Sequence, residues 1–271
     1  HVRSRRQRQM CIRDRPRVIP VVLISDKGES IKTLNFKKRI YLGDPVNTVS
    51  LFNSFQVDEL ILLNIDSRKE NFHIDYDLLI DIAQEAEMPF AIGGGIDSLD
   101  KIRRILSLGA EKVVLSKAAI ENPAFLKEAV DQFGSSSITI CLDVKKNFFG
   151  THSVYIDQQK SKLSLDQCLD IIEQNQAGEV ILQNINLDGA MTGYDLNLLQ
   201  YVSDYLSMPV VALGGAGSIN DIKFLEKNSN VSAFAAGSLF VFQDSNRGVL
   251  INYPSEEELL ELCIMEKNFP R

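Results

Sequence analysis

Histidine and cysteine are scarce in this chain: its 271 residues include three histidines and four cysteines. The cysteines show no spacing typical of metal ligands, and they lie at Cys11, Cys141, Cys168 and Cys263. Cys141 lies in an apolar segment, which predicts a small core residue rather than a reactive thiol. We therefore expect no metal site, no cofactor and a reducing, cytoplasmic compartment.

Long hydrophobic runs are also absent. No apolar run approaches the roughly 18 residues that a membrane-spanning helix needs, so we expect no membrane segment. A content of 45% hydrophobic and 24% charged residues is ordinary for a globular protein. The length allows one large α/β domain or two small ones, with a sizeable core.

Negative charge is nearly missing from the start of the chain. The first 15 residues carry six arginines and one aspartate, a net charge of +5, so the remainder carries −12 of the total of −7. A basic arm that binds nucleic acid is one interpretation. The segment also resembles translated sequencing-adapter sequence, and we therefore treat residues 1–16 as a non-native basic leader. The acidic remainder argues against nucleic-acid binding.

Short runs rich in Val, Ile and Leu alternate with amphipathic segments along the rest of the chain. The candidate strands are Val18–Leu23, Glu59–Asn64, Pro89–Ile92, Lys112–Leu115, Ile138–Asp143, Glu179–Gln183, Pro209–Leu213 and Ala233–Ala236. These runs are continuously apolar, which is typical of parallel strands covered on both faces. Among the segments between them, 97–106 places Leu99, Ile102 and Leu106 on one helical face.

The second half of the chain repeats the first. Ile61–Asp66 (ILLNID) reappears at Ile181–Asn186 (ILQNIN), and the glycine cluster after the third candidate strand has a counterpart after the seventh. Eight βα units predict a single (β/α)8 TIM barrel over 17–271, with half-barrels at about 17–136 and 137–262. A doubly wound open sheet is the alternative, but two halves of four units close a barrel symmetrically.

An unusually long connection, Lys145–Lys160, follows the fifth candidate strand. Its aromatic and β-branched residues suggest a small hairpin. In a barrel this hairpin would lie at the C-terminal end, where active-site loops sit. We call that end of the barrel the mouth.

The two glycine clusters each follow a strand and open a helix, a context in which backbone N–H groups can approach an anion. Each cluster is paired with a strand end about 20 residues later. The candidate phosphate ligands are Gly94, Gly95, Ser116 and Lys117, named here the first cradle, and Asp188, Gly189, Gly215, Ala216, Gly237 and Ser238, named the second cradle. Two cradles predict a ligand with two phosphates. The alternatives are that the glycines only make tight turns and that Lys117 is a solvated surface residue.

Asp143 ends the fifth candidate strand, where its carboxylate would face the mouth and could accept or donate a proton. The repeat places Leu23 at the equivalent position of the first strand. The alternative for Asp143 is a structural ion pair with Lys145 or Lys146. Other polar residues at strand ends either line the mouth or form turns: Asn64, Asp66, Asn184 and Asn186.

Several of these segments together resemble the cyclase subunit of imidazole glycerol phosphate synthase. The segments are Gly43–Pro45, the two glycine clusters, Ala118–Pro123, Asn186–Gly189 and Gly193–Asp195. The resemblance runs from about Arg17 to Leu262. A related isomerase of the same pathway shares the half-barrel repeat and the glycines, but the segments after the sixth strand and the long loop after the fifth favour the cyclase.

The resemblance implies a barrel that takes ammonia from a glutaminase partner and combines it with a ribulosyl bisphosphate. It also implies two catalytic aspartates, at the ends of the first and fifth strands. The second falls on Asp143, but the first position is Leu23, and Asp26 lies three residues further on. Asn64 and Asn186 also stand where the family usually has Asp. Since a leucine cannot transfer a proton, ordinary cyclase activity is in doubt.

With Leu23 at the position of the first catalytic aspartate, the chain resembles a side branch of the family found with surface-polysaccharide genes. There the barrel serves a glutaminase and a separate sugar amidotransferase that makes an acetamidino sugar, so this chain would act as an ammonia conduit. A phosphosugar isomerase is a third hypothesis, although it too needs two carboxylates.

A glutaminase nucleophile needs a cysteine with a histidine base, and beyond His1 the chain has only His73 and His152. We therefore expect a separate glutaminase partner at the N-terminal end of the barrel. The repeat places Glu59 and Glu179 symmetrically at that end, where they would gate ammonia entry, as the resemblance implies, or simply form surface ion pairs.

Overall fold

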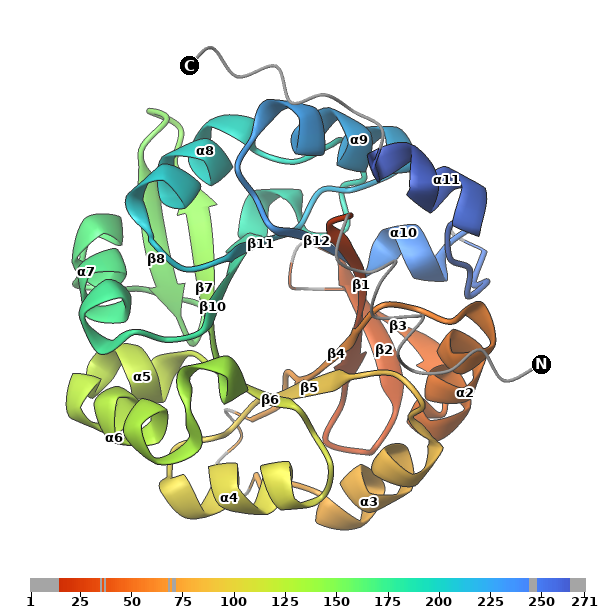
Figure 1. The fold of residues 1–271 in the computed structure, drawn as a ribbon, viewed down its shortest axis with the longest axis horizontal. Helices are drawn as coiled ribbons and strands as arrows, with labels where there is room; N and C mark the ends of the chain where they lie inside the picture. The colour runs from red at the N-terminus through yellow and green to blue at the C-terminus, as the bar shows by residue number, and fades with distance from the viewer. Residues whose placement is uncertain are drawn as a thin grey trace.

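The computed structural model describes residues 15–34, 36, 38–67, 69, 72–243 and 248–263. Within these residues, eight parallel strands form a closed barrel inside a ring of helices (Figure 1). In barrel order the strands are β1 (Arg17–Ile24), β4 (Leu60–Asn64), β5 (Phe90–Gly93), β6 (Lys112–Leu115), β7 (Ile138–Lys146), β10 (Glu179–Asn184), β11 (Val210–Leu213) and β12 (Ala233–Ala236). β12 pairs in parallel with β1, so the last strand meets the first. The predicted (β/α)8 TIM barrel is confirmed.

Helices connect the strands and cover the outside of the barrel (Figure 1). They are α2 (Pro45–Phe55), α3 (Tyr76–Glu85), α4 (Leu99–Ser107), α5 (Lys117–Glu121), α6 (Pro123–Phe133), α7 (Leu165–Asn175), α8 (Leu196–Tyr205), α9 (Ile219–Asn228), α10 (Ser238–Val241) and α11 (Glu256–Leu260), with 3₁₀ turns at Ser135–Ser137, Ile185–Leu187 and Glu261–Cys263. Several helices begin at a polar residue whose side chain accepts a backbone N–H. Asp44, Asp75 and Ser164 do so, and each removes one unsatisfied donor from a helix start.

Two hairpins project beyond the barrel strands. The hairpin predicted within Lys145–Lys160 is present, since β7 pairs antiparallel with β8 (His152–Ile156), which pairs with β9 (Gln159–Lys160). A second hairpin, β2 (Ser30–Leu34) and β3 (Lys38–Gly43), follows β1 and was not predicted. Its β3 strand is mixed in polarity and largely solvent-accessible, so it lacks the continuous apolar run by which the barrel strands were found.

The alternation of side chains along each strand divides the core into two parts. One part fills the space between the strands and the helices and includes Phe52, Ile82 and Leu126. The other fills the barrel interior and consists of Ile19, Val21, Leu23, Ile31, Ile61, Ala91, Val114, Cys141, Ile181, Val211, Leu213, Ala233 and Ala235. Cys141 is therefore a buried core residue, as predicted.

Most of the proposed leader, residues 1–14, lies outside the described residues, and Cys11 lies there too. Arg15, the next residue, donates two hydrogen bonds to the carboxylate of Asp58, both at 2.7 Å. None of the helices that the structure describes combines the length and the apolar character needed to cross a membrane.

A leucine buried between the strands and the helices should contribute more to stability than a leucine on the surface. Leu126 on α6 is fully buried, whereas Leu51 on α2 is 47% exposed. We predict that Leu126→Ala lowers the free energy of unfolding by about 2–5 kcal/mol, because it leaves a cavity. Leu51→Ala, the matched control, should change it by less than about 0.5 kcal/mol. Urea unfolding of the two variants measures the difference, and equal losses would contradict the assignment of the core.

Candidate functional site

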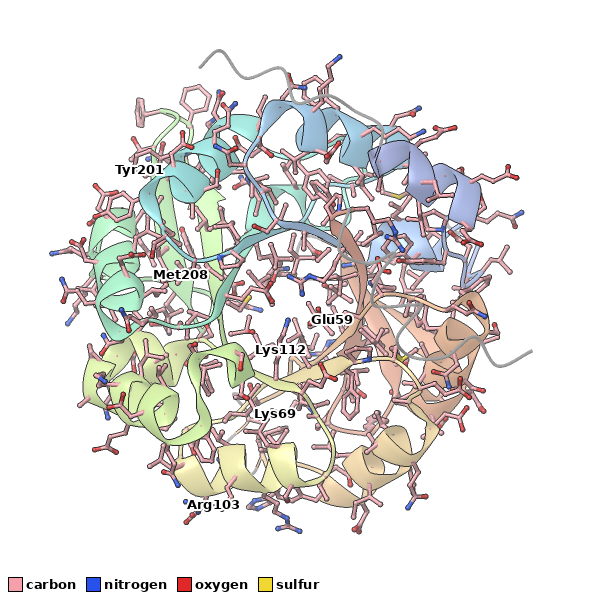
Figure 2. The ribbon with its side chains drawn as sticks, in the orientation of Figure 1. Glu59, Lys69, Arg103, Lys112, Tyr201 and Met208 are labelled. Atoms are coloured by element: carbon pink, nitrogen blue, oxygen red, sulfur yellow. The ribbon has the colours of Figure 1, made fainter. Side chains whose placement is uncertain are left out.

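The N-terminal end of the barrel is closed by four charged side chains, which we name the gate ring: Arg17, Glu59, Lys112 and Glu179. Lys112 Nζ donates to Glu59 Oε1 at 2.9 Å and to Glu179 Oε2 at 3.0 Å. The Arg17 guanidinium donates to the other oxygen of each carboxylate, Glu59 Oε2 and Glu179 Oε1. Figure 2 shows Glu59 and Lys112 directed toward the barrel axis. The four charges sum to zero, and each carboxylate contacts both cations.

The structure brings the two predicted glutamates together and adds two residues that sequence reasoning missed. Arg17 and Lys112 each open a barrel strand, as Glu179 does. Basic residues open β1 and β6, Glu179 opens β10 and Glu59 directly precedes β4, but only the closed barrel shows which of these charges meet. Burial opposes ionisation of Glu179, but Arg17 and then Lys112 outweigh it, so the pKa of Glu179 lies below its ordinary value.

The mouth contains a cavity of about 590 Å³ on the side of the first half-barrel, a volume typical of small-molecule sites. All four first-cradle residues line it, namely Gly94, Gly95, Ser116 and Lys117. Lys117 Nζ pairs with Asp157 at 2.7 Å, and its side chain is 54% exposed. Asp143 and Gln183 also line the cavity, so the first cradle and the predicted acid–base group face one space.

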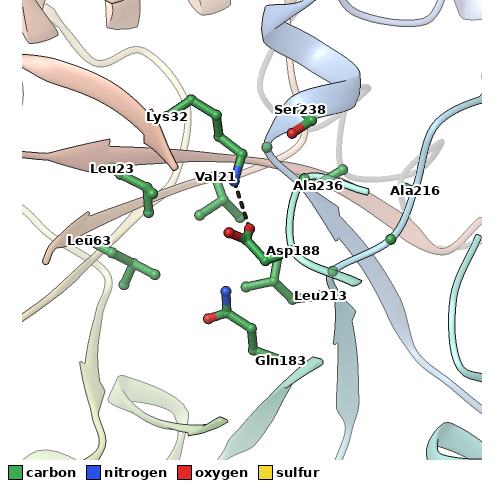
Figure 3. A pocket seen from close by; sticks show the side chains of 14 residues that line it. Val21, Leu23, Lys32, Leu63, Gln183, Asp188, Leu213, Ala216, Ala236 and Ser238 are labelled. Carbon is green, nitrogen blue, oxygen red and sulfur yellow. Dashed lines mark hydrogen bonds and ion pairs between the residues drawn. The ribbon is translucent and has the colours of Figure 1, made fainter. Parts of the chain in front are cut away.

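The second cradle is nearly closed. Its cavity measures only about 20 Å³ and is lined by all six predicted residues, which are Asp188, Gly189, Gly215, Ala216, Gly237 and Ser238. Lys32 of the unpredicted hairpin reaches in and donates to Asp188 Oδ1 at 2.7 Å, with both side chains at least nine-tenths buried (Figure 3). Thr33 Oγ1 donates to the other oxygen of Asp188 at 3.0 Å. The carboxylate of Asp188 therefore holds a lysine in this cradle.

The backbone of the cradles requires glycine at several points. A Cβ at Gly94 would lie 2.3 Å from the carbonyl oxygen of Asn64, and one at Gly215 would lie 2.1 Å from that of Gly193. These contacts explain the glycines by close backbone packing, and anion binding remains a prediction. One feature of the second cradle does favour a ligand: the hydroxyl of Ser238 is buried and has no hydrogen-bond partner among the described residues.

The mouth is polar on one side and apolar on the other. Asp143 registers with Gln183 across the β7–β10 ladder. The equivalent positions of the first half, Leu23 and Leu63, register with each other across β1–β4. Leu23, Leu63 and Gln183 line both cavities and so lie between the two cradles. Figure 3 shows the two leucines facing the space beside Lys32 and Asp188.

The group nearest in sequence to the missing carboxylate does not replace it. Asp26 forms an ion pair with Lys69 at 2.6 Å, and Asp26 is not among the residues that line either cavity. Lys145, one of the proposed ion-pair partners of Asp143, lies over the ring of Tyr155, with Nζ 5.5 Å from the ring centroid. An acid–base role for Asp143 stays a prediction.

Asn64 and Asn184 form turns at equivalent strand ends. Asn64 Oδ1 accepts the N–H of Asp66 at 2.9 Å, and Asn184 Oδ1 accepts the N–H of Asn186 at 3.0 Å. The half-barrel repeat is thus preserved in hydrogen bonding. Asn186 in turn bonds the backbone of Lys146.

Asp66 has a different task, because it anchors the β2–β3 hairpin. Arg39 on β3 donates to both of its oxygens, at 2.6 and 2.8 Å. These hydrogen bonds hold the pKa of Asp66 below its ordinary value. With Lys32 bound to Asp188, the hairpin is fastened at two points beside the mouth.

No group of three or more His, Cys, Asp or Glu side chains within the described part of the chain is arranged to hold a metal ion. Both cysteines whose side chains are described are buried. Burial, followed by the charge of Asp143, raises the pKa of Cys141, and burial raises that of Cys168 to about 11. Neither is a thiolate at neutral pH.

Comparison with known proteins shows which family this chain resembles. The sequence model of the family described as "Histidine biosynthesis protein" matches residues 17–246. A Pseudomonas aeruginosa protein provisionally named imidazole glycerol phosphate synthase subunit hisF2 is 42% identical over 250 residues, covering 90% of this chain and 98% of the relative. A Leptospira interrogans protein, provisionally named subunit HisF of the same synthase, is 38% identical over 247 residues, or 90% and 97% of the two chains. The imidazole glycerol phosphate synthase subunit HisF of Lactococcus lactis subsp. cremoris is 35% identical over 232 residues, or 84% and 89%.

The lowered pKa of Glu179 predicts how the stability of the protein depends on pH. Because the folded-state pKa of Glu179 is lowered, its contribution to stability is present at neutral pH and is lost as the pH falls from the unfolded-state value of about 4.3 through the folded-state pKa. We expect Glu179→Gln to lower the free energy of unfolding by about 1–3 kcal/mol at pH 7. The deficit should shrink below about pH 4.

Urea unfolding across a pH series measures this deficit. Glu128→Gln on the exposed surface of α6 is the matched control and should leave the profile unchanged. A deficit for Glu179→Gln that stays constant from pH 7 to pH 3 would contradict the ion pairing described for the ring.

Proposed function

The chain belongs to the histidine biosynthesis protein family, and on that premise we propose that it is an ammonia-using synthase subunit similar to the cyclase of imidazole glycerol phosphate synthase. Ammonia enters through the gate ring, crosses the barrel and meets a phosphorylated ligand at the mouth. The observation that carries the proposal is the gate ring, in which two cations and two carboxylates close one end of the barrel while the cradles surround the other.

The described residues offer no glutaminase chemistry, so we infer that the ammonia comes from another protein. The two described cysteines are held as thiols by burial, and a glutaminase needs a cysteine that a histidine can activate. His152 is engaged with Asp195, with Nε2 3.2 Å from Oδ2. We therefore propose a separate glutaminase that docks at the N-terminal end of the barrel and releases ammonia against the gate ring.

The ligand at the mouth is a sugar-like bisphosphate in this proposal. The open first cradle offers Lys117 and two glycines to one phosphate. The second cradle offers the hydroxyl of Ser238, which has no partner among the described residues, and Lys32, which keeps further N–H donors for a phosphate while Asp188 holds it. The carboxylate of Asp188 positions that lysine rather than contacting an anion itself, since two negative groups repel.

A second candidate function is favoured by Leu23. Acid–base assistance by one group is worth about 10²–10⁴-fold in rate, and the position opposite Asp143 is an aliphatic side chain that lines the mouth. The barrel would then deliver ammonia to a separate sugar amidotransferase, as in the polysaccharide branch, and catalyse little cyclisation itself. The two provisionally named relatives are also more similar to this chain than the Lactococcus subunit is.

A substitution separates the two functions. With ammonium and the ribulosyl bisphosphate substrate, we expect wild-type turnover to be slow and Leu23→Asp to raise it by about 10-fold or more. Imidazole product formation, followed by chromatography, measures the change. Leu63→Asp, which adds a carboxylate on the neighbouring strand, should give no increase, and Asp143→Asn should abolish the gain. Fast wild-type turnover that Leu23→Asp does not improve would contradict the hypothesis that the barrel mainly delivers ammonia to another enzyme.

The proposed role of Lys117 in the first cradle predicts that its substitution weakens ligand binding. We expect Lys117→Met to weaken binding of the same bisphosphate by about 10-fold or more, the loss of one charge-assisted hydrogen bond. Lys127→Met is the control, because Lys127 lies on the exposed surface of α6 in an ion pair with Asp131. Isothermal titration calorimetry measures both, and equal affinities for the two variants would show that Lys117 is a surface residue.

A further inference from the structure

The broken repeat extends along a whole strand. β1 and β7 occupy equivalent positions in the two halves, and beyond the gate ring each turns three side chains toward the barrel axis. Those of β1 are the apolar Ile19, Val21 and Leu23, whereas those of β7 are the polar or polarisable Thr139, Cys141 and Asp143. The first half therefore presents a hydrocarbon wall where the second presents hydrogen-bonding groups.

The neighbouring strand adds to the polar wall. In the β7–β10 ladder, the inward pairs from bottom to top are Thr139 with Glu179, Cys141 with Ile181, and Asp143 with Gln183. We name these two strands the polar seam. It begins at a member of the gate ring and ends at the mouth. On the other barrel strands, the inward positions between the gate ring and the mouth belong to the apolar interior cluster.

Thr139 is the unusual member of the seam. It is 1% exposed, and its hydroxyl has no hydrogen-bond partner among the described residues. It registers with Val114 on one side and with Glu179 on the other. A buried hydroxyl without a partner is destabilising, and valine would fill the same space without that cost. The position thus keeps a polar atom that folding does not use.

We propose that the Thr139 hydroxyl is a hydrogen-bonding station for ammonia on its way from the gate ring to the mouth, an inference that rests on the proposed function. Ammonia that leaves water for an apolar interior loses its hydrogen bonds, and that loss is a barrier to passage. A hydroxyl can donate to the nitrogen lone pair and accept an N–H. It does so without transferring a proton, so ammonia stays neutral and mobile.

The next group along the seam suits the same task. Burial raises the pKa of the Cys141 thiol, so it remains an uncharged S–H above Thr139. Beyond it, the amide of Gln183 and the carboxylate of Asp143 line the cavity that holds the first cradle. Ammonia that follows the seam is released beside Asp143 and on the polar side of the mouth.

An isotope competition tests this inference. The chain in complex with its glutaminase is given glutamine labelled with ¹⁵N in the amide, unlabelled ammonium and the bisphosphate substrate. Mass spectrometry of the product gives the ratio of channelled to bulk nitrogen even at slow turnover. We expect the wild type to favour ¹⁵N, and Thr139→Val to lower the ratio by about 3- to 10-fold, the value of one neutral hydrogen bond. Turnover with ammonium alone should not change, because bulk ammonia reaches the mouth directly.

The controls distinguish the effect of the hydroxyl group from the effect of side-chain shape. Thr139→Ser keeps the hydroxyl and should keep the wild-type ratio, whereas Thr139→Val keeps the shape and should melt at the same or a higher temperature. Thr139→Ala provides a second variant without a hydrogen-bonding group if the valine protein does not fold. A Thr139→Val ratio equal to wild type, or an equal fall in the serine variant, would overturn the inference alone. Wild-type product that follows bulk ammonium would overturn the proposed function, and this inference with it.

Discussion

The pairing of β12 with β1 is the constraint on which every site in this protein depends. That pairing closes the barrel and sets Arg17 beside Ala233, at the first position of the β1–β12 register. Only in the closed barrel can Arg17 reach Glu179, which lies 162 residues away in sequence. The gate ring is therefore a product of closure, and so is the mouth, where residues from both halves line the two cavities.

Closure also explains why buried charge is tolerated in the gate ring. A buried ion pair gains little over apolar packing, because desolvation opposes the attraction between its charges. In the ring each carboxylate contacts two cations and each cation contacts two carboxylates, so no charge is left alone. Stability alone therefore does not explain these four charges, and the proposed passage of ammonia would give them a role.

The half-barrel repeat could be read from the sequence. Its barrel strands could be predicted, whereas the hairpin after β1 and the charges that meet inside the barrel could not. Strand bounds such as Ala233–Ala236 were predicted as the structure has them, because buried parallel strands are continuously apolar. The β2–β3 hairpin was missed, because its mixed polarity carries no such signal, and with it were missed Lys32 and Arg39. Arg17 and Lys112 were missed for another reason: which charges meet across a barrel depends on closure and register, and neither is written in local spacing. The unpartnered hydroxyl of Thr139 is visible only when every neighbour is in place.

The roles proposed for the gate ring and the mouth both depend on directed passage of ammonia through the barrel. The most direct measurement is the ratio of aminated product to glutamine hydrolysed by the complex, with an enzyme that consumes free ammonia added to the solution. We expect a ratio close to one that the scavenging enzyme does not lower, since channelled ammonia would move from the gate ring to the mouth without entering the solvent. A ratio that falls toward zero as scavenging enzyme is added would contradict it.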